Sequence, residues 1–160
     1  MVRIKSRSAA SSILIAMGGA LAASGATAHG DEHHHEHAAF GQPGDPAKVS
    51  RSVAIDMNDT MRYNPARISV KRGETIRFVA KNSGQVKHEL VLGTVKDLRE
   101  HAALMRKFPE MEHADPNQLA VDPGKTGELL WQFTKSGTFD FACLQPGHYE
   151  AGMHGKIAVK

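Results

Sequence analysis

The chain of 160 residues is long enough for one domain of ordinary size, but not for two. Its formal charge of +3 comes from the N-terminus: residues 1–28 hold three basic and no acidic residues, so the rest of the chain carries 3 − 3 = 0. This balance gives no electrostatic reason to expect nucleic acid as a partner. The single cysteine excludes an internal disulfide.

Residues 1–28 are typical of a secretory signal peptide. Three basic residues precede an apolar run over residues 9–23, and Ala26-Thr27-Ala28 fits a cleavage site made of small residues. The run is shorter than the roughly 20 residues that span a bilayer, although an uncleaved anchor is the alternative interpretation. The charged start contains no adjacent arginine pair, which favours general export of an unfolded chain. We therefore expect a periplasmic protein with no membrane anchor after cleavage.

Residues 29–48 are expected to form a His-rich flexible leader and linker. His29 would begin the mature chain, and its free amine and imidazole together could chelate copper. Four further histidines follow: His33, His34, His35 and His37. This composition suits a mobile metal-collecting tail, and equally well an ordinary solvated linker. Proline and glycine residues between positions 41 and 48 predict that the linker continues up to the folded domain, 49–160.

Within residues 49–160, short runs of hydrophobic residues alternate with polar ones, as in half-buried strands. The pattern predicts strands over residues 49–57, 68–70, 74–81, 86–92, 128–133, 139–143 and 157–159. About eight short strands, separated by turn residues and without alternating helices, are typical of an antiparallel β-sandwich. We therefore predict an all-β fold.

One segment, residues 93–123, departs from the strand pattern. Thr94, with Asp97 three residues later, can cap a helix. The apolar residues that follow have helical spacing and are Leu98, Ala102, Met105 and Phe108. The helix should end before Pro109, and the rest of the segment reads as irregular. The sandwich is therefore expected to carry one helical insertion.

The last predicted turn holds an unusual set of side chains. Cys143 ends a strand with inward aromatic residues, His148 follows a Gln-Pro-Gly turn, and Met153 follows a second turn of small residues. With one more histidine, these residues make the ligand set of a type 1 copper site, whose trigonal geometry suits both Cu(I) and Cu(II). His88 is the candidate, because it shares the inward face of its strand with Leu90. A buried inert thiol and a satisfied core histidine are the alternatives, and the combined pattern disfavours both.

These features make residues 49–160 resemble the cupredoxins, the small type 1 copper proteins that include plastocyanin, azurin and rusticyanin. The matching parts are the stretch 70–78, the approach from Asn82 to His88, and the Cys/His/Met loop. The resemblance implies a Greek-key sandwich with copper held by His88, Cys143, His148 and Met153. Within the family, the His-rich leader and the insertion are most similar to periplasmic cupredoxins of copper tolerance. Glu89 departs from the family pattern, since many members have there an asparagine that braces the ligand loops.

Other chemistries fit the sequence less well. A binuclear copper centre would need two cysteines, and structural zinc usually takes more thiolates or no thioether. A Cys–His nucleophile pair would lack an obvious oxyanion site. Further copper could bind to residues outside the type 1 set: His29, His33, His34, His35, His37, His101, Met105, Met111 and His113. The alternative is that Met105 packs in the core and the histidines are solvated.

The surplus of thioether and imidazole groups favours a periplasmic protein of copper tolerance. It would bind copper ions and could oxidise Cu(I) to Cu(II), using one-electron redox at the copper. Cuprous oxidation is the enzymatic activity that the sequence favours, because no general acid/base pair can be placed in a pocket for an organic substrate. The alternative is a soluble electron-transfer shuttle, whose redox partner protein would dock near His148. Deletion of the gene separates the two hypotheses, since the first predicts copper sensitivity and the second a respiratory defect.

Overall fold

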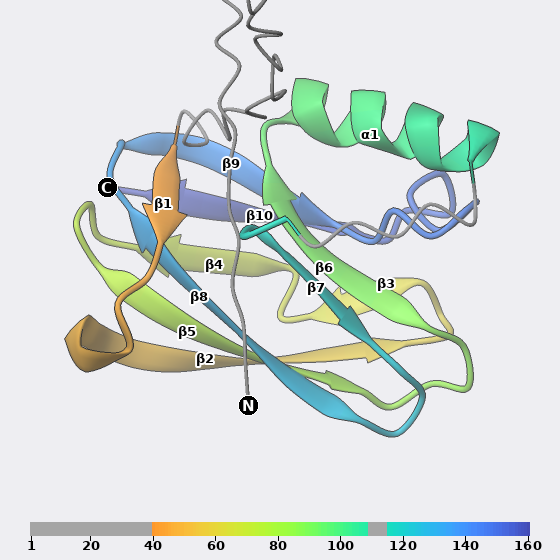
Figure 1. The fold of residues 1–160 in the computed structure, drawn as a ribbon, viewed down its shortest axis with the longest axis horizontal. Coiled ribbons are helices and arrows are strands. Elements are labelled where there is room, and N and C mark those ends of the chain that lie inside the picture. The colour runs from red at the N-terminus through yellow and green to blue at the C-terminus, as the bar shows by residue number, and fades with distance from the viewer. Residues whose placement is uncertain (1–39, 109–114) are drawn as a thin grey trace, which may run out of the picture. The chain divides into compact units, whose positions relative to one another are not determined.

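The computed structural model describes residues 40–108 and 115–160, and in this part of the chain ten strands form two five-stranded sheets (Figure 1). The first sheet contains, in spatial order, β1 (Gly41–Pro43), β8 (Thr126–Phe133), β5 (Thr75–Asn82), β2 (Val49–Asn58) and β3 (Arg62–Asn64). The second contains β4 (Arg67–Val70), β10 (His154–Val159), β9 (Gly137–Ala142), β6 (His88–Gly93) and β7 (Gln118–Val121). The predicted all-β sandwich is confirmed, with ten strands in the described residues where about eight were expected.

Two strand pairs correct the prediction of a wholly antiparallel sandwich. β2 runs parallel to β5, and β4 runs parallel to β10. After β2 the chain turns back through β3, crosses to the other sheet at β4, and returns as β5 beside β2. Such a crossover makes parallel neighbours possible, whereas a hairpin does not. The remaining neighbours are antiparallel.

The core lies between the two sheets. Inward side chains alternate along the strands with exposed ones, as the period-2 pattern predicts. Ile55, Phe78, Phe133, Phe141 and Ile157 are among the fully buried members. β6 is buried along its whole length. Its inward residues Leu90 and Leu92 belong to this core, and the intervening Val91 packs on the other face against the helix.

The insertion forms helix α1 (Val95–Lys107) as predicted. Thr94 and Asp97 make a reciprocal capping box: the Asp97 amide donates to Thr94 Oγ1 at 3.2 Å, and the Thr94 amide donates to Asp97 Oδ2 at 3.2 Å. Leu98, Ala102 and Met105 are buried against Val91. Phe108 was expected on the same apolar face but is 52% exposed, because it follows the last helical residue with non-helical backbone angles.

Regular structure is present earlier in the chain than the sequence pattern predicts. Instead of a linker over residues 41–48, the structure has β1 paired with β8 and a 3₁₀ helix over Pro46–Lys48. Phe40 explains the difference, because its buried ring lies 5.3 Å from the ring of Trp131 and 5.0 Å from that of Phe139. Pro43 is accommodated because β1 is an edge strand. Within the described residues no helix is long and apolar enough to span a membrane.

Candidate metal centre

The four predicted ligand residues come from neighbouring strands of the second sheet and the loop that follows. His88 begins β6, and Cys143 directly follows β9, which pairs with β6. His148 and Met153 lie in the loop between β9 and β10. Main-chain hydrogen bonds close this loop, from the Cys143 amide to the Met153 carbonyl at 3.1 Å and from the Met153 amide to the His148 carbonyl at 3.0 Å.

Glycine permits the tight course of the ligand loop. Gly147 and Gly152 have φ angles of 85° and 96°, in the left-handed region that other residues rarely adopt. Gly147 directly precedes His148, and Gly152 directly precedes Met153. The turn chemistry noted in the sequence therefore places two of the four predicted ligands.

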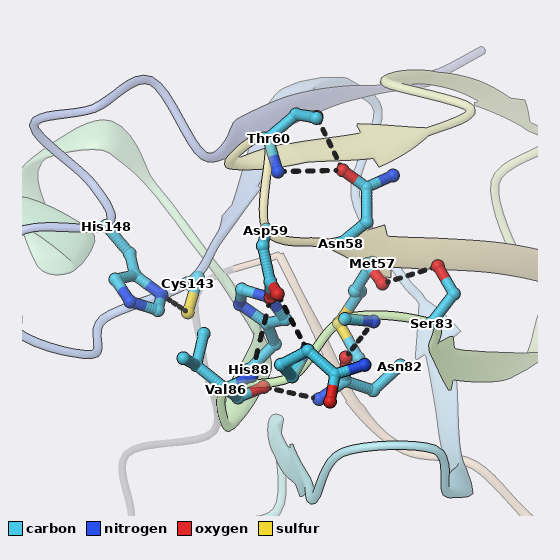
Figure 2. A network of polar contacts seen from close by, with 12 residues as sticks. Met57, Asn58, Asp59, Thr60, Asn82, Ser83, Val86, His88, Cys143 and His148 are labelled. Carbon is cyan, nitrogen blue, oxygen red and sulfur yellow. Dashed lines mark hydrogen bonds and ion pairs between the residues drawn. The ribbon is translucent and has the colours of Figure 1, made fainter.

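His88, Cys143 and His148 meet at one point. One potential ligand atom from each residue lies within 4.8 Å of those of the other two. Cys143 Sγ is 3.2 Å from His148 Nδ1, and the two imidazole ring centroids are 5.1 Å apart (Figure 2). Met153 is fully buried and belongs to the same core cluster as Cys143. Among the described residues, His88, Cys143 and His148 form the only group of three or more His, Cys, Asp or Glu side chains that could share a metal ion.

The donor atoms in the cluster fit a copper ion. His88 is 0% exposed, and its Nδ1 is a buried nitrogen without a hydrogen-bond partner in the described structure. A buried polar atom of this kind requires an explanation, and metal coordination supplies one. Its other nitrogen, Nε2, lies 3.1 Å from Asp59 Oδ1. Two imidazoles, one thiolate and a buried thioether are a donor set that suits copper.

Burial favours the neutral forms of Cys143 and His148 in the metal-free protein. It raises the pKa of the Cys143 thiol to about 12, against the opposing effect of the main-chain amides of Gln145 and Glu89. Burial also lowers the pKa of His148, and the nearby His88 lowers it further. A metal ion that binds here must therefore displace the thiol proton, but it finds His148 with a free lone pair.

Glu89 takes the place of the bracing asparagine. Its main-chain amide donates to Cys143 Sγ at 3.3 Å. Its buried side chain accepts a hydrogen bond from Gln145 Nε2, in the ligand loop, at 2.6 Å. The hydroxyl of Tyr63 donates to the Glu89 carbonyl. The glutamate therefore joins β6 to the ligand loop, as the asparagine was expected to do. Sequence reasoning missed Gln145, whose position inside the ligand loop is the one available signal.

Two of the additional copper candidates, His101 and Met105, lie within the described residues, and both are on α1. Met105 is buried in the helix–sheet cluster, which agrees with the packing alternative. His101 lies on α1 and is partly exposed. The remaining candidates lie outside the described residues: His29, His33, His34, His35, His37, Met111 and His113.

The fold and the side-chain cluster together define a copper-binding β-sandwich, and comparison with known proteins agrees. Residues 49–160 match the sequence profile of the family described as copper binding proteins, plastocyanin/azurin family. The chain is 54% identical over 135 residues to the copper-resistant cuproprotein CopI of Rubrivivax gelatinosus, covering 84% of this chain and 82% of that protein. It is 37% identical over 165 residues to the CopI of Pseudomonas aeruginosa, covering 85% and 90%.

Solved structures support the fold. Auracyanin B superposes with a TM-score of 0.63 at 22% identity, covering 78% of this chain and 99% of that one. Dithionite-reduced auracyanin from Roseiflexus castenholzii gives a TM-score of 0.60 at 22% identity, covering 70% and 98%. The chain belongs to the plastocyanin/azurin family of copper-binding proteins, and copper is its metal.

Proposed function

We propose that this protein holds copper in a type 1 centre formed by His88, Cys143, His148 and Met153, and that it acts in copper tolerance. The observation that carries the proposal is the convergence of three ligand atoms within 4.8 Å, with the buried Nδ1 of His88 left unpartnered. Bound copper would supply one-electron redox between Cu(I) and Cu(II). The chain's own contribution is to hold two imidazoles and a thiol in place and to exclude water from His88 and Cys143.

The role in tolerance is supported by the relatives, which are named copper-resistant cuproproteins. The export signal expected in residues 1–28 supports a periplasmic location, where such a protein would meet incoming copper. The proposal includes a more specific activity, the oxidation of Cu(I) to Cu(II). Each Cu(I) ion oxidised would give one electron to the Cu(II) of the type 1 centre, so turnover would require a redox partner protein to take that electron away.

A visible spectrum of the copper-loaded mature protein, with metal analysis, tests the centre. We expect an intense thiolate-to-copper charge-transfer band at one copper per centre, and Cys143→Ser should abolish the band. His154→Ala is the matched control, because His154 is exposed and lies outside the cluster. Wild-type protein without the band, after full loading, would refute the type 1 centre.

Growth on copper tests the role. A strain lacking the gene should be copper-sensitive, and the wild-type gene should restore growth where Cys143→Ser does not. Equal growth of the deletion strain and its parent on copper would exclude the tolerance role.

A soluble electron shuttle is the second candidate, because His148 is only partly buried whereas His88 and Cys143 are fully enclosed. The loop before His88 also exposes Val86, which is 42% accessible. A partly exposed ligand and an exposed apolar side chain would suit transient docking of a redox partner protein near His148. A respiratory defect on deletion, with unchanged copper tolerance, would select this function.

A further inference from the structure

Asp59 makes a contact that the ligand set alone does not explain. It lies in the turn between β2 and β3, on the first sheet, whereas His88 begins a strand of the second sheet. Its Oδ1 is 3.1 Å from His88 Nε2 (Figure 2). The same carboxylate accepts the Gln85 amide on Oδ2 at 2.7 Å and, at 3.4 Å, the Val86 amide on Oδ1. One side chain therefore holds both the ligand and the loop that leads to it.

The contact with Asp59 indicates which ring nitrogen of His88 carries no hydrogen. A carboxylate only accepts hydrogen bonds, so the imidazole must carry its hydrogen on Nε2 in order to donate to Asp59. In a neutral imidazole the hydrogen is then absent from Nδ1, which keeps its lone pair. Nδ1 is the buried atom without a partner in the described structure. The hydrogen bond on one side of the ring thus prepares the other side for a metal.

The loop is built around this carboxylate. A Cβ atom on Gly84 would lie 2.0 Å from Asp59 Oδ1, so only glycine allows the carboxylate to approach. Buried Asn82 fixes the same loop by accepting the Gly84 amide at 2.9 Å and donating to the Val86 carbonyl at 2.8 Å. On the other side, Asn58 Oδ1 accepts the Thr60 amide at 3.1 Å and shapes the turn that presents Asp59.

We propose that Asp59 is a positioning residue that locks His88 in the Nε2–H tautomer, so that Nδ1 is held ready for the metal before copper arrives. The proposal rests on the ligand role of His88 proposed above. Carboxylate partners of metal-binding histidines fix ring orientation in other metal sites, and their removal typically weakens metal binding by 10–100-fold. We expect a loss of this size in copper affinity when the Asp59 carboxylate is removed.

The tautomer can be read directly in the metal-free protein. Long-range ¹⁵N–¹H correlation spectra should show His88 as the Nε2–H tautomer in the wild type, and as a mixture or the Nδ1–H form in Asp59→Ala. Chelator competition should show a 10–100-fold loss of Cu(I) affinity in the same variant. Asp59→Asn keeps the size of the side chain, and it should show an intermediate loss because it can still accept from Nε2.

Asp56→Ala is the matched control. Asp56 also binds the β5–β6 loop, through Ser83 Oγ at 2.9 Å, but it does not contact His88. This variant should keep the wild-type tautomer and the wild-type copper affinity. The proposal is overturned if the wild-type apoprotein has the Nδ1–H tautomer, or if Asp59→Ala keeps both the Nε2–H tautomer and full affinity. Because the spectrum is taken without copper, its result is independent of whether the type 1 centre forms.

Discussion

At the scale of single residues, Glu89 places a buried carboxylate beside the thiol that would bind copper. Its side chain is only 4% exposed, and its amide donates to Cys143 Sγ. The negative charge contributes to the raised pKa of Cys143. The same charge should favour Cu(II) over Cu(I), because it stabilises the more positive ion. An asparagine in its place would brace the loop without this effect.

Glu89→Gln should therefore raise the reduction potential of the copper centre. The substitution keeps the volume of the side chain and removes the charge. At several ångströms and an effective dielectric constant of about 20, one charge is worth roughly 2 kcal/mol. With 59 mV for each tenfold change in a one-electron couple, we expect an increase of about 50–100 mV. A spectroelectrochemical titration measures this change.

Glu128→Gln is the control for that titration. Glu128 is an exposed glutamate on β8 whose partner is Arg77 at 3.5 Å. Solvent and salt screen such an exposed charge, so Glu128→Gln should leave the reduction potential of the copper centre nearly unchanged. An unchanged potential in Glu89→Gln, with the charge-transfer band intact, would rule out the electrostatic role of Glu89.

The sequence predicts most readily those candidate ligands that lie close together in the chain. Cys143, His148 and Met153 were predicted because they share one short loop with recognisable turns, and the structure gathers two of them with His88. Asp59 and Gln145 were not predicted. Their partners lie 29 and 56 residues away in the chain, respectively. Nothing in the local pattern around Asp59 distinguishes a residue that orients a histidine from any aspartate in a turn.

At the scale of elements, α1 is attached to the ligand loop. Tyr149, the neighbour of His148, packs against the helix–sheet cluster that contains Met105. Arg106 on the helix donates to the carboxylate of Glu150 in the loop. The exposed ion pair should contribute little, and burial at Met105 should contribute most of the attachment. The insertion thus supports the loop by packing.

Met105→Ala should lower the free energy of unfolding by about 2–4 kcal/mol, because it leaves a cavity between α1 and β6. Met105→Leu keeps the volume and should cost less than about 1.5 kcal/mol. Both variants should bind as much copper as the wild type, since the thioether serves packing. Urea unfolding and metal analysis of the two proteins test these expectations.

Leu104→Ala is the comparison for the cavity effect, because Leu104 is exposed on the same helix. It should change the stability by less than about 1 kcal/mol. Loss of one copper equivalent in Met105→Leu would contradict the packing role and restore Met105 as a metal ligand.

Helices and strands were easiest to predict where they are long and where capping or turn residues mark their ends. The capping residues Thr94 and Asp97 marked the start of α1, and the longer strands showed clear alternation. β3 and β7, with three and four residues, respectively, lie in segments that read as irregular and were missed. β4, which also has four residues, was predicted because Ile68 and Val70 alternate with Ser69. The parallel pairing of β2 with β5 depends on where the chain crosses between sheets, which no local pattern records.

At the scale of the whole described domain, both sheets contribute to the metal centre. The second sheet supplies His88 at the start of β6 and Cys143 directly after the adjacent β9, and the first sheet supplies Asp59 from the turn after β2. The packing of the sandwich therefore sets the distance between a ligand and its hydrogen-bond partner. Phe40 also joins the two sheets, because its ring contacts Trp131 of β8 and Phe139 of β9.

A chain that begins at Val49, the boundary expected from the sequence, should be markedly less stable than one that begins at Phe40. The shorter chain lacks β1 and exposes the aromatic residues that Phe40 covers. Truncation of a buried phenylalanine alone typically costs about 3–5 kcal/mol, so Phe40→Ala in the longer chain should account for most of the loss. Urea unfolding of the three proteins, monitored by tryptophan fluorescence, measures the difference.

Asp45→Ala, in the chain that begins at Phe40, separates the aromatic contact from the segment that follows it. Asp45 accepts the Ala47 amide at 2.9 Å and caps the 3₁₀ helix on the surface. Its removal should cost about 1 kcal/mol, the usual value for a lost cap. If the chain beginning at Val49 unfolds at the same urea concentration as the longer one, the ring of Phe40 does not hold the two sheets together. In that case the domain would begin at Val49, as the turn residues between positions 41 and 48 first indicated.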